Sequence, residues 1–284
     1  MTAAAAAIDP TLPGTVLGGV NYIGAMDERP RYFAQDHSRD KLVLDPRTVP
    51  IINARRLADP PSLDREGFAL VRHRTAVSNF RDPEEVKRVH NPEIAALIRE
   101  LTGADKAVVS GAGVLRFGER SKDAGTLLNS WPARFVHIDT SNATARAFAA
   151  RALPGGEAEL AGYRRYAHYN VWRALSPPPQ DVPLAICDAR SVAAEDLVAA
   201  DAVFDAPGVP EWQFEGLVIR HNTRHRWLYF ADMDIGDALV FKTKDSDPEQ
   251  PHHCPHSAFD DPSCPPGVPP RASVEMRVAA FFAE

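Results

Sequence analysis

Two stretches of the chain carry side chains that could hold a transition metal. In RFVHIDTSN, residues 134–142, a histidine and an aspartate stand two positions apart. A strand would turn His137 and Asp139 to one face and the apolar residues beside them to the other. With 10 histidines in 284 residues, about one His-x-Asp pair is expected by chance. The motif alone therefore also fits a core histidine that is hydrogen-bonded to a neighbouring carboxylate.

The second stretch, HHCPHSAFDDP, begins at residue 252 and is rich in imidazoles. His256 directly precedes the small-residue run SAF, where a strand would begin, and is the natural third ligand. Two imidazoles and one carboxylate on one face of a metal form the facial triad of non-haem iron oxygenases. A structural zinc cluster is the alternative, but it needs four ligands from five adjacent residues, unlike the usual paired spacing. Its members would be His252, His253, Cys254 and His256.

A third motif, RASVEMR at residues 271–277, is suited to binding a carboxylate. Arg271 and Ser273 alternate onto one strand face, and an arginine with a hydroxyl two residues on can hold a carboxylate by charge-assisted hydrogen bonds. Arg277 lies on the same expected face and is an alternative anchor. A surface strand in which Glu275 pairs with one arginine would explain the same residues without a ligand. The order His-x-Asp, distal histidine, Arg-x-Ser is much rarer than any one part.

Short strands between turns are expected to position these motifs. They lack the regular β-α alternation of a Rossmann or TIM arrangement and favour a sandwich or jelly roll. Helical segments are expected near residues 142–152 and 192–200. The predicted strands are GFALVRHRT, GVLRFG, RFVHIDT, YRRYAHYNVW, VPLAICD, EGLVIRH, HRWLYFAD, DALVFKT and RASVEMRVAAFF.

Two helices are predicted between residues 82 and 103. Asp82 and Asn91 each precede a proline, which is the pattern of an N-cap followed by the first helical position. Gly103 is the expected end of the second helix. One apolar stripe on that helix is most simply packed against a sheet, and its members are Ile94, Leu97, Ile98 and Leu101.

Composition limits the classes of function. The chain is 44% hydrophobic and 25% charged with a net charge of −6, which gives no electrostatic reason to expect nucleic acid or an anionic membrane surface. Three cysteines without a CxxC motif favour a reduced compartment, and no apolar run approaches the roughly 20 residues of a membrane helix. We expect a cytoplasmic protein with one domain over residues 1–284, in which an N-terminal extension of about 1–65 packs on the core. A homodimer is left open.

Several blocks of the sequence together resemble the hydroxylase/desaturase family that includes CmcJ-, AsaB- and NvfI-like proteins. With the upstream stretch that runs from DREGFALVRHRT to RELTGA, the likeness covers nearly the whole chain from about residue 15. The blocks are YNVWRALSPPPQDVPLAICDARSV, HRWLYFADMDIGDALVFKTKDSD, PHSAFDDP and RASVEMRVAAFF.

The resemblance implies a mainly β protein with flanking helices (α+β), folded as a double-stranded β-helix of the jelly-roll, cupin-like type. It also implies a non-haem Fe(II)/2-oxoglutarate-dependent dioxygenase, with 2-oxoglutarate and O₂ as co-substrates. The substrate would be a small organic molecule or natural product of secondary metabolism that is hydroxylated, desaturated or similarly oxidised. Carried onto this sequence, the iron ligands are His137, Asp139 and His256. Arg271 and Ser273 are the expected 2-oxoglutarate anchors.

Five further residues are expected to line the substrate pocket: Asn170, Trp172 and Arg173 of YNVWR, with Trp227 and Tyr229 of HRWLYF. Ordinary aromatic core is an equally good interpretation of Trp227 and Tyr229. The chain departs from the family at His90, where a tyrosine is frequent, and at Lys244, where the family carries an aromatic residue. These differences concern the pocket and not the ligands.

Two other functions fit the same motifs. The first is a cupin-like accessory protein that binds a metal or a small molecule without redox turnover. The second is a zinc hydrolase, which ranks lower because no carboxylate is well placed as a general base.

Overall fold

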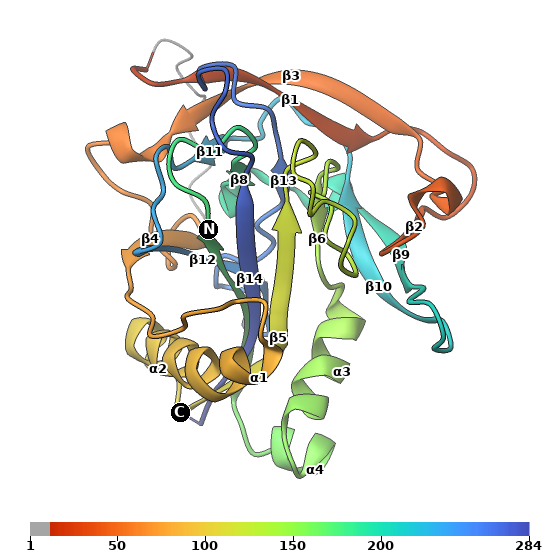
Figure 1. The fold of residues 1–284 in the computed structure, drawn as a ribbon. Helices are drawn as coiled ribbons and strands as arrows, with labels where there is room; N and C mark the ends of the chain where they lie inside the picture. The colour runs from red at the N-terminus through yellow and green to blue at the C-terminus, as the bar shows by residue number, and fades with distance from the viewer. Residues whose placement is uncertain (1–11, 284) are drawn as a thin grey trace.

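The structure, a computed structural model, describes residues 12–283, and it consists of two β-sheets with helices gathered at one side (Figure 1). In spatial order, the nine-stranded sheet contains β1 (Val16–Ile23), β3 (Leu44–Asn53), β11 (Trp227–Tyr229), β8 (Leu184–Cys187), β13 (His256–Ala258), β6 (His137–Ile138), β10 (Trp212–Ile219), β9 (Leu197–Phe204) and β2 (Arg31–Phe33). The five-stranded sheet contains β4 (Phe68–Arg72), β12 (Asp237–Asp245), β7 (Arg165–Ala174), β14 (Ala272–Phe282) and β5 (Lys106–Phe117). The α-helices are α1 (Pro83–Glu85), α2 (Asn91–Thr102), α3 (Asn142–Ala152) and α4 (Gly156–Leu160).

Strands that are distant in the sequence lie side by side in both sheets. The strand β13 sits between β8 and β6, and β14 sits between β7 and β5, in each case antiparallel to both neighbours. Two facing sheets with these crossovers form the jelly roll that the sequence predicted. The expectation of a mainly β protein with flanking helices is confirmed.

One hydrophobic cluster lies between the two sheets. Ile52, Ile186 and Leu228 reach it from the nine-stranded sheet, and Trp172 and Phe241 reach it from the five-stranded sheet. The opposite face of the five-stranded sheet is covered by the helical segment that ends with α2. Burial on both faces explains why the central strands of this sheet are almost wholly buried.

Along β14, apolar and polar side chains alternate between the two faces of the strand. Val274, Met276 and Val278 belong to the cluster under α2. The odd-numbered residues therefore face the other sheet, which directs Arg271, Ser273, Glu275 and Arg277 toward the interior of the jelly roll. The shared face predicted for the RASVEMR motif follows from this alternation, which pairing with β7 keeps in register from Ser273 to Phe282.

The two helices predicted between residues 82 and 103 form one continuous helical segment. Asp82 caps its start, because its carboxylate accepts hydrogen bonds from the backbone N–H groups of Glu84 and Glu85. Asn91 is not a cap: it has helical backbone angles, and its side chain donates to the carbonyl of Gly111 at 2.8 Å. A π-helical turn over residues 86–90 joins the two parts.

The start of the sequence and residues 197–204 contain strands that were not predicted. Residues 16–53 supply β1, β2 and β3 of the nine-stranded sheet, and residues 1–11 of the expected N-terminal extension lie outside the described residues. The helix expected near 192–200 is wrong, since a single 3₁₀ turn at Ala194–Asp196 leads into β9. Pairing of all eight β9 residues with β10 overrides the helical preference of its alanines. Over residues 12–283, no helix is both long and apolar enough to cross a bilayer.

Candidate metal centre

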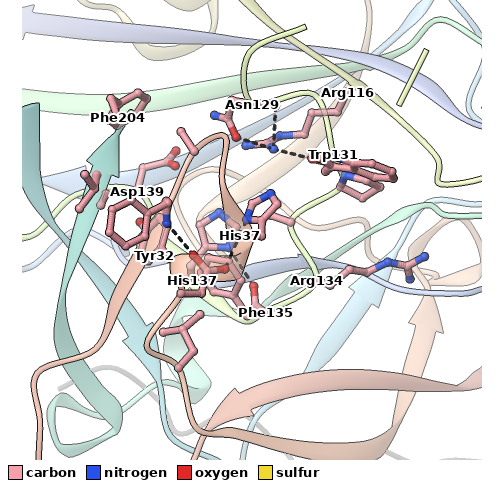
Figure 2. A pocket seen from close by; sticks show the side chains of 18 of the residues that line it. Tyr32, His37, Arg116, Asn129, Trp131, Arg134, Phe135, His137, Asp139 and Phe204 are labelled. Carbon is pink, nitrogen blue, oxygen red and sulfur yellow. Dashed lines mark hydrogen bonds and ion pairs between the residues drawn. The ribbon is translucent and has the colours of Figure 1, made fainter. Parts of the chain in front are cut away.

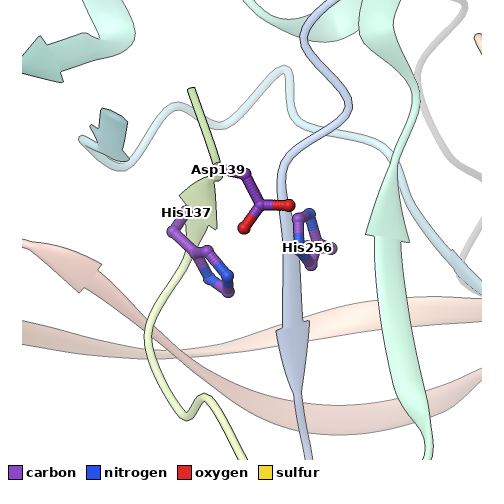
Figure 3. A group of neighbouring side chains, drawn as sticks. All are labelled: His137, Asp139 and His256. Atoms are coloured by element: carbon purple, nitrogen blue, oxygen red, sulfur yellow. The ribbon is translucent and has the colours of Figure 1, made fainter. Parts of the chain in front are cut away.

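His137, Asp139 and His256 meet in the interior of the jelly roll (Figure 3). The strands β6 and β13 are neighbours, and His137 and His256 lie directly opposite each other in the register. One potential ligand atom from each of the three residues lies within 4.8 Å of the others, and all three side chains are buried. Within residues 12–283 this is the one group of three or more such residues close enough to share a metal ion. The three predicted ligands are therefore brought together.

Backbone carbonyls fix the orientation of both imidazoles. The Nδ1 atom of His137 lies 2.9 Å from the carbonyl oxygen of Phe135, and Nδ1 of His256 lies 3.2 Å from that of Cys254. A carbonyl only accepts hydrogen bonds, so each Nδ1 carries the proton and each Nε2 offers its lone pair. Metal-binding histidines are usually oriented by partners of this kind.

Two side chains hold the carboxylate of Asp139 in place. The amide of Asn170 donates to Oδ2 at 2.5 Å, and Nη2 of Arg277 donates to Oδ1 at 3.1 Å. Burial alone would raise the pKa of Asp139, but Arg277 and the two imidazoles hold it below its usual value. Burial and the neighbouring His256 lower the pKa of His137 to about 3, and burial also lowers that of His256. At neutral pH the cluster thus has the protonation states that a metal ion requires: two neutral imidazoles and one carboxylate.

The two arginines of the RASVEMR motif have different surroundings. Arg277 is paired with carboxylates, since Nη2 lies 3.1 Å from Asp139 and 3.4 Å from Glu275. Arg271 is 1% exposed, and its Nη1 donates to the carbonyl of Val182 at 3.0 Å. Its Nε and Nη2 are buried without a hydrogen-bond partner among the described residues. Burial, with Arg116 nearby, lowers the pKa of Arg271 to about 9.

A cavity of about 370 Å³ opens beside the cluster (Figure 2). His137 and Asp139 are on its wall together with Arg116, Tyr32 and Trp131. The Nη1 atom of Arg116 is held by the carbonyls of residues 129 and 131. Sequence reasoning missed Arg116, although a lone arginine between Leu and Phe in a predicted strand was a signal that could have pointed to it. A second cavity of about 320 Å³ shares Asp139 with the first.

Comparisons with known proteins show to which family the chain belongs. The family model for the oxidoreductase/YMDC permease-like domain matches residues 20–281. The hydroxylase/desaturase CTB9 of Cercospora beticola is 32% identical over 251 residues, which are 83% of this chain and 76% of that protein. The chain belongs to the hydroxylase/desaturase family. The resemblance inferred from the sequence blocks is thereby confirmed.

Other relatives carry more specific names. The Fe(II)/2-oxoglutarate-dependent dioxygenase nvfI of Aspergillus novofumigatus is 27% identical over 241 residues, covering 83% of this chain and 84% of that protein. A solved structure of the iron and alpha-ketoglutarate-dependent endoperoxidase NvfI superposes with a TM-score of 0.81 at 23% identity, over 95% of this chain and 99% of that one. This likeness supports the jelly-roll fold.

The residues predicted to line a substrate pocket do not all reach the cavities. Asn170 does, since it lines the second cavity and touches Asp139. Trp172 packs in the core between the sheets, and Trp227 is fully buried with its Nε1 donating to Tyr22 at 2.7 Å. Neither lines either cavity beside the cluster, so a substrate-binding role for them stays a prediction.

Two further predicted pocket residues also lie away from the cluster. Arg173 donates to backbone carbonyls of His73 and Ile235, and Tyr229 packs edge-on against Phe259. Neither borders the two cavities. Their substrate-binding role stays a prediction as well.

The alternative of a zinc cluster in HHCPHSAFDDP is wrong. Of its four members, His256 alone belongs to the group of potential ligands found within residues 12–283. The thiol of Cys254 faces the backbone carbonyls of Glu66 and Gly67, and Nδ1 of His252 faces the carbonyl of Gln250. The backbone turns at His253, where φ is 71°, and these neighbours contact different partners.

Proposed function

We propose that the protein is a non-haem Fe(II)/2-oxoglutarate-dependent oxygenase that oxidises C–H bonds of a small organic or natural-product substrate. The observation that carries the proposal is the buried group of His137, Asp139 and His256, whose ligand atoms lie within 4.8 Å of one another. Two imidazoles and one carboxylate suit Fe(II) and leave coordination positions open for co-substrates. Relatives named Fe(II)/2-oxoglutarate-dependent dioxygenase and alpha-ketoglutarate-dependent dioxygenase support the same reaction class.

The side chains of the cluster have separate roles in this proposal. His137 and His256 bind the metal through Nε2, because their Nδ1 atoms are directed at carbonyls. Asp139 supplies the negative charge, and Asn170 and Arg277 set its orientation. Bound Fe(II) supplies the oxidising chemistry, in which decarboxylation of 2-oxoglutarate by O₂ is coupled to oxidation of the substrate. The aromatic walls of the adjoining cavities exclude water from the reacting groups.

Arg271, with Ser273, is proposed as the anchor for the distal carboxylate of 2-oxoglutarate. The unused Nε and Nη2 of Arg271 support this role, since a buried guanidinium without partners is a costly feature that a bound carboxylate would compensate. Arg277 is the weaker candidate because Asp139 and Glu275 already neutralise it. We assign Arg277 the role of counter-ion to Asp139.

The proposal also covers the cellular setting. Three free cysteines, two of them buried, support a reducing compartment such as the cytoplasm. We propose that residues 1–284 act as one oxygenase domain on a small molecule. A homodimer and the absence of a nucleic-acid partner stay predictions.

The test is an anaerobic titration of the purified protein with Fe(II) and 2-oxoglutarate. A chelated oxoacid gives a visible charge-transfer band, and admission of O₂ should then yield succinate. His137→Ala and Asp139→Ala should abolish both signals, and the loop variant His252→Asn should keep them. Full succinate production by purified His137→Ala would remove the ligand assignment. Tight iron binding without the band would favour the non-catalytic cupin-like protein instead.

A further inference from the structure

The second cavity beside the metal centre, here called the aromatic cavity, has a wall made largely of rings. Its volume is about 320 Å³, which is within the range of small-molecule sites. It reaches Asp139 and Arg277, so a molecule inside it lies next to the His137, Asp139 and His256 group. The rings that line it are Phe148, Phe204, Trp212 and Phe214, together with Tyr169 and the imidazole of His168.

Three of these rings pack closely against one another. Phe204 and Trp212 are stacked, with ring centroids 4.4 Å apart and an angle of 14° between the planes. Phe214 continues the stack at 5.5 Å and 25° from Phe204. Phe204 and Trp212 face each other across the β9–β10 pair, and Trp212 is 48% exposed. A cluster of packed rings with a large exposed ring at its rim suits an unsaturated or aromatic ring system that packs against it.

The aromatic cavity also carries one arginine whose charge is not compensated. On α3, Arg146 pairs with Glu157 at 2.8 Å. Arg151, five residues further along α3, lines the cavity, and within residues 12–283 it has no carboxylate within 4.0 Å. Its guanidinium carbon lies 5.5 Å from the centre of the Phe148 ring. The cation therefore stands at the edge of the aromatic wall without an acidic partner.

The other charges at the cavity cancel one another. Asp139 is paired with Arg277, and Arg277 also contacts Glu275. Asp139 is the one carboxylate among the residues that line the cavity, so Arg151 leaves it with a surplus positive charge. A carboxylate on the substrate would complete this arrangement by a charge-assisted hydrogen bond.

We propose that the substrate is a carboxylic acid with a flat, unsaturated ring system, and that Arg151 selects it. The ring lies against Phe204, Trp212 and Phe214, and the carboxylate binds Arg151. This orientation directs the rest of the molecule toward the metal centre. The inference rests on the proposed oxygenase function, because it assigns the aromatic cavity to the oxidised substrate.

The experiment compares two probes that differ only in charge, naphthalene-2-carboxylate and naphthalene-2-carboxamide. Each is titrated by calorimetry into protein loaded with Fe(II) and 2-oxoglutarate in the absence of O₂. The wild type should bind the carboxylate at least about tenfold more tightly than the amide. Arg151→Gln should remove this preference, and Arg146→Gln, on the same helix but paired with Glu157, should keep it. Trp212→Leu should weaken both probes alike.

Several outcomes would overturn the inference. These are equal affinity of the wild type for the two probes, no binding of either probe, or the same loss of preference in Arg146→Gln as in Arg151→Gln. The charge-transfer band, recorded for every sample, separates this failure from failure of the proposed function. A wild-type protein that shows the band but no preference for the carboxylate refutes the substrate class alone.

Discussion

Replacing Arg271 by methionine should remove most of the affinity for 2-oxoglutarate while leaving the unliganded protein as stable as before. The side chain is 1% exposed, and its Nε and Nη2 have no partner in the described part of the chain. Methionine is unbranched and flexible, so it can fill the space of the arginine stem. The variant therefore tests the charge without opening a large void.

The magnitude follows from the surroundings of the guanidinium. Removal of one partner of a buried, hydrogen-bonded charge pair costs about 2–5 kcal/mol. At about 1.4 kcal/mol per tenfold change, the Kd for 2-oxoglutarate should rise roughly 30- to 4,000-fold. The unliganded fold loses the hydrogen bond from Nη1 to Val182, worth about 1 kcal/mol. The substitution also removes the cost of burying the Arg271 cation, whose pKa is lowered to about 9. This gain in stability should offset the lost hydrogen bond.

Thermal unfolding with and without 2-oxoglutarate measures both effects. A ligand at about 100 times its Kd stabilises the wild type by about 2.7 kcal/mol, and at the same ligand concentration this shift should fall to about 0.9 kcal/mol or less in Arg271→Met. Arg173→Met is the matched control, since Arg173 is equally buried but donates to the carbonyls of His73 and Ile235. It should lower stability by about 2 kcal/mol and leave the ligand-induced shift intact.

One result would refute this reasoning. If Arg277→Met lost the affinity for 2-oxoglutarate while Arg271→Met kept it, the anchor would be Arg277. Because Arg277 also contacts Asp139 at 3.1 Å, the iron content of that variant must be measured separately. Loss of iron alone would leave the assignment of Arg271 standing.

Three further predictions concern the metal centre, the pH dependence and the helical segment. Asn170→Ala removes the hydrogen bond to Oδ2 of Asp139 and should weaken iron binding about 10- to 100-fold in a chelator competition assay; unchanged affinity would contradict the positioning role. Burial lowers the pKa of His168 to about 4, so stability should fall as pH drops from about 6.5 to about 4, because the unfolded chain then binds a proton that the folded chain excludes. In His168→Gln this fall in the free energy of unfolding, measured with urea, should be smaller by up to about 3 kcal/mol, and an unaltered pH profile would exclude the effect. Asp82→Ala, which removes the cap at Glu84 and Glu85, should cost about 1 kcal/mol at neutral pH by the same assay, and no change would show that the cap contributes little.

The candidate ligands could be predicted because their chemistry and spacing are local properties of the sequence. In a strand, His137 and Asp139 would share a face at any register, although β6 itself ends at Ile138. The start of a strand at His256 followed from the small residues after it. Arg271, Ser273 and Arg277 shared a face for the same reason. What the sequence could not supply was the distance between these motifs, which depends on β6 lying next to β13.

The walls of the cavities were beyond sequence reasoning for a related reason. Tyr32, Arg116 and Trp131 meet beside His137 although they come from three segments without a common pattern. The strand β9 also depends on another segment, because its alanine-rich sequence favours a helix and the pairing with β10 makes it a strand. Features that arise from pairing between distant segments leave no periodic trace in either segment.

The alternating motif on β14 shows how one strand face can serve two parts of a site. Glu275 and Arg277 lie toward Asp139, where Arg277 bridges the two carboxylates. Burial and the nearby Asp139 raise the pKa of Glu275, and Arg277 opposes this rise. At the other end of the motif, the Nε and Nη2 atoms of Arg271 have no hydrogen-bond partner in the described part of the chain. Arg277 is thus paired with two carboxylates, whereas Arg271, the proposed anchor of a diacid, has two guanidinium nitrogens without a partner among the described residues. The two arginines should therefore respond differently to the same substitution.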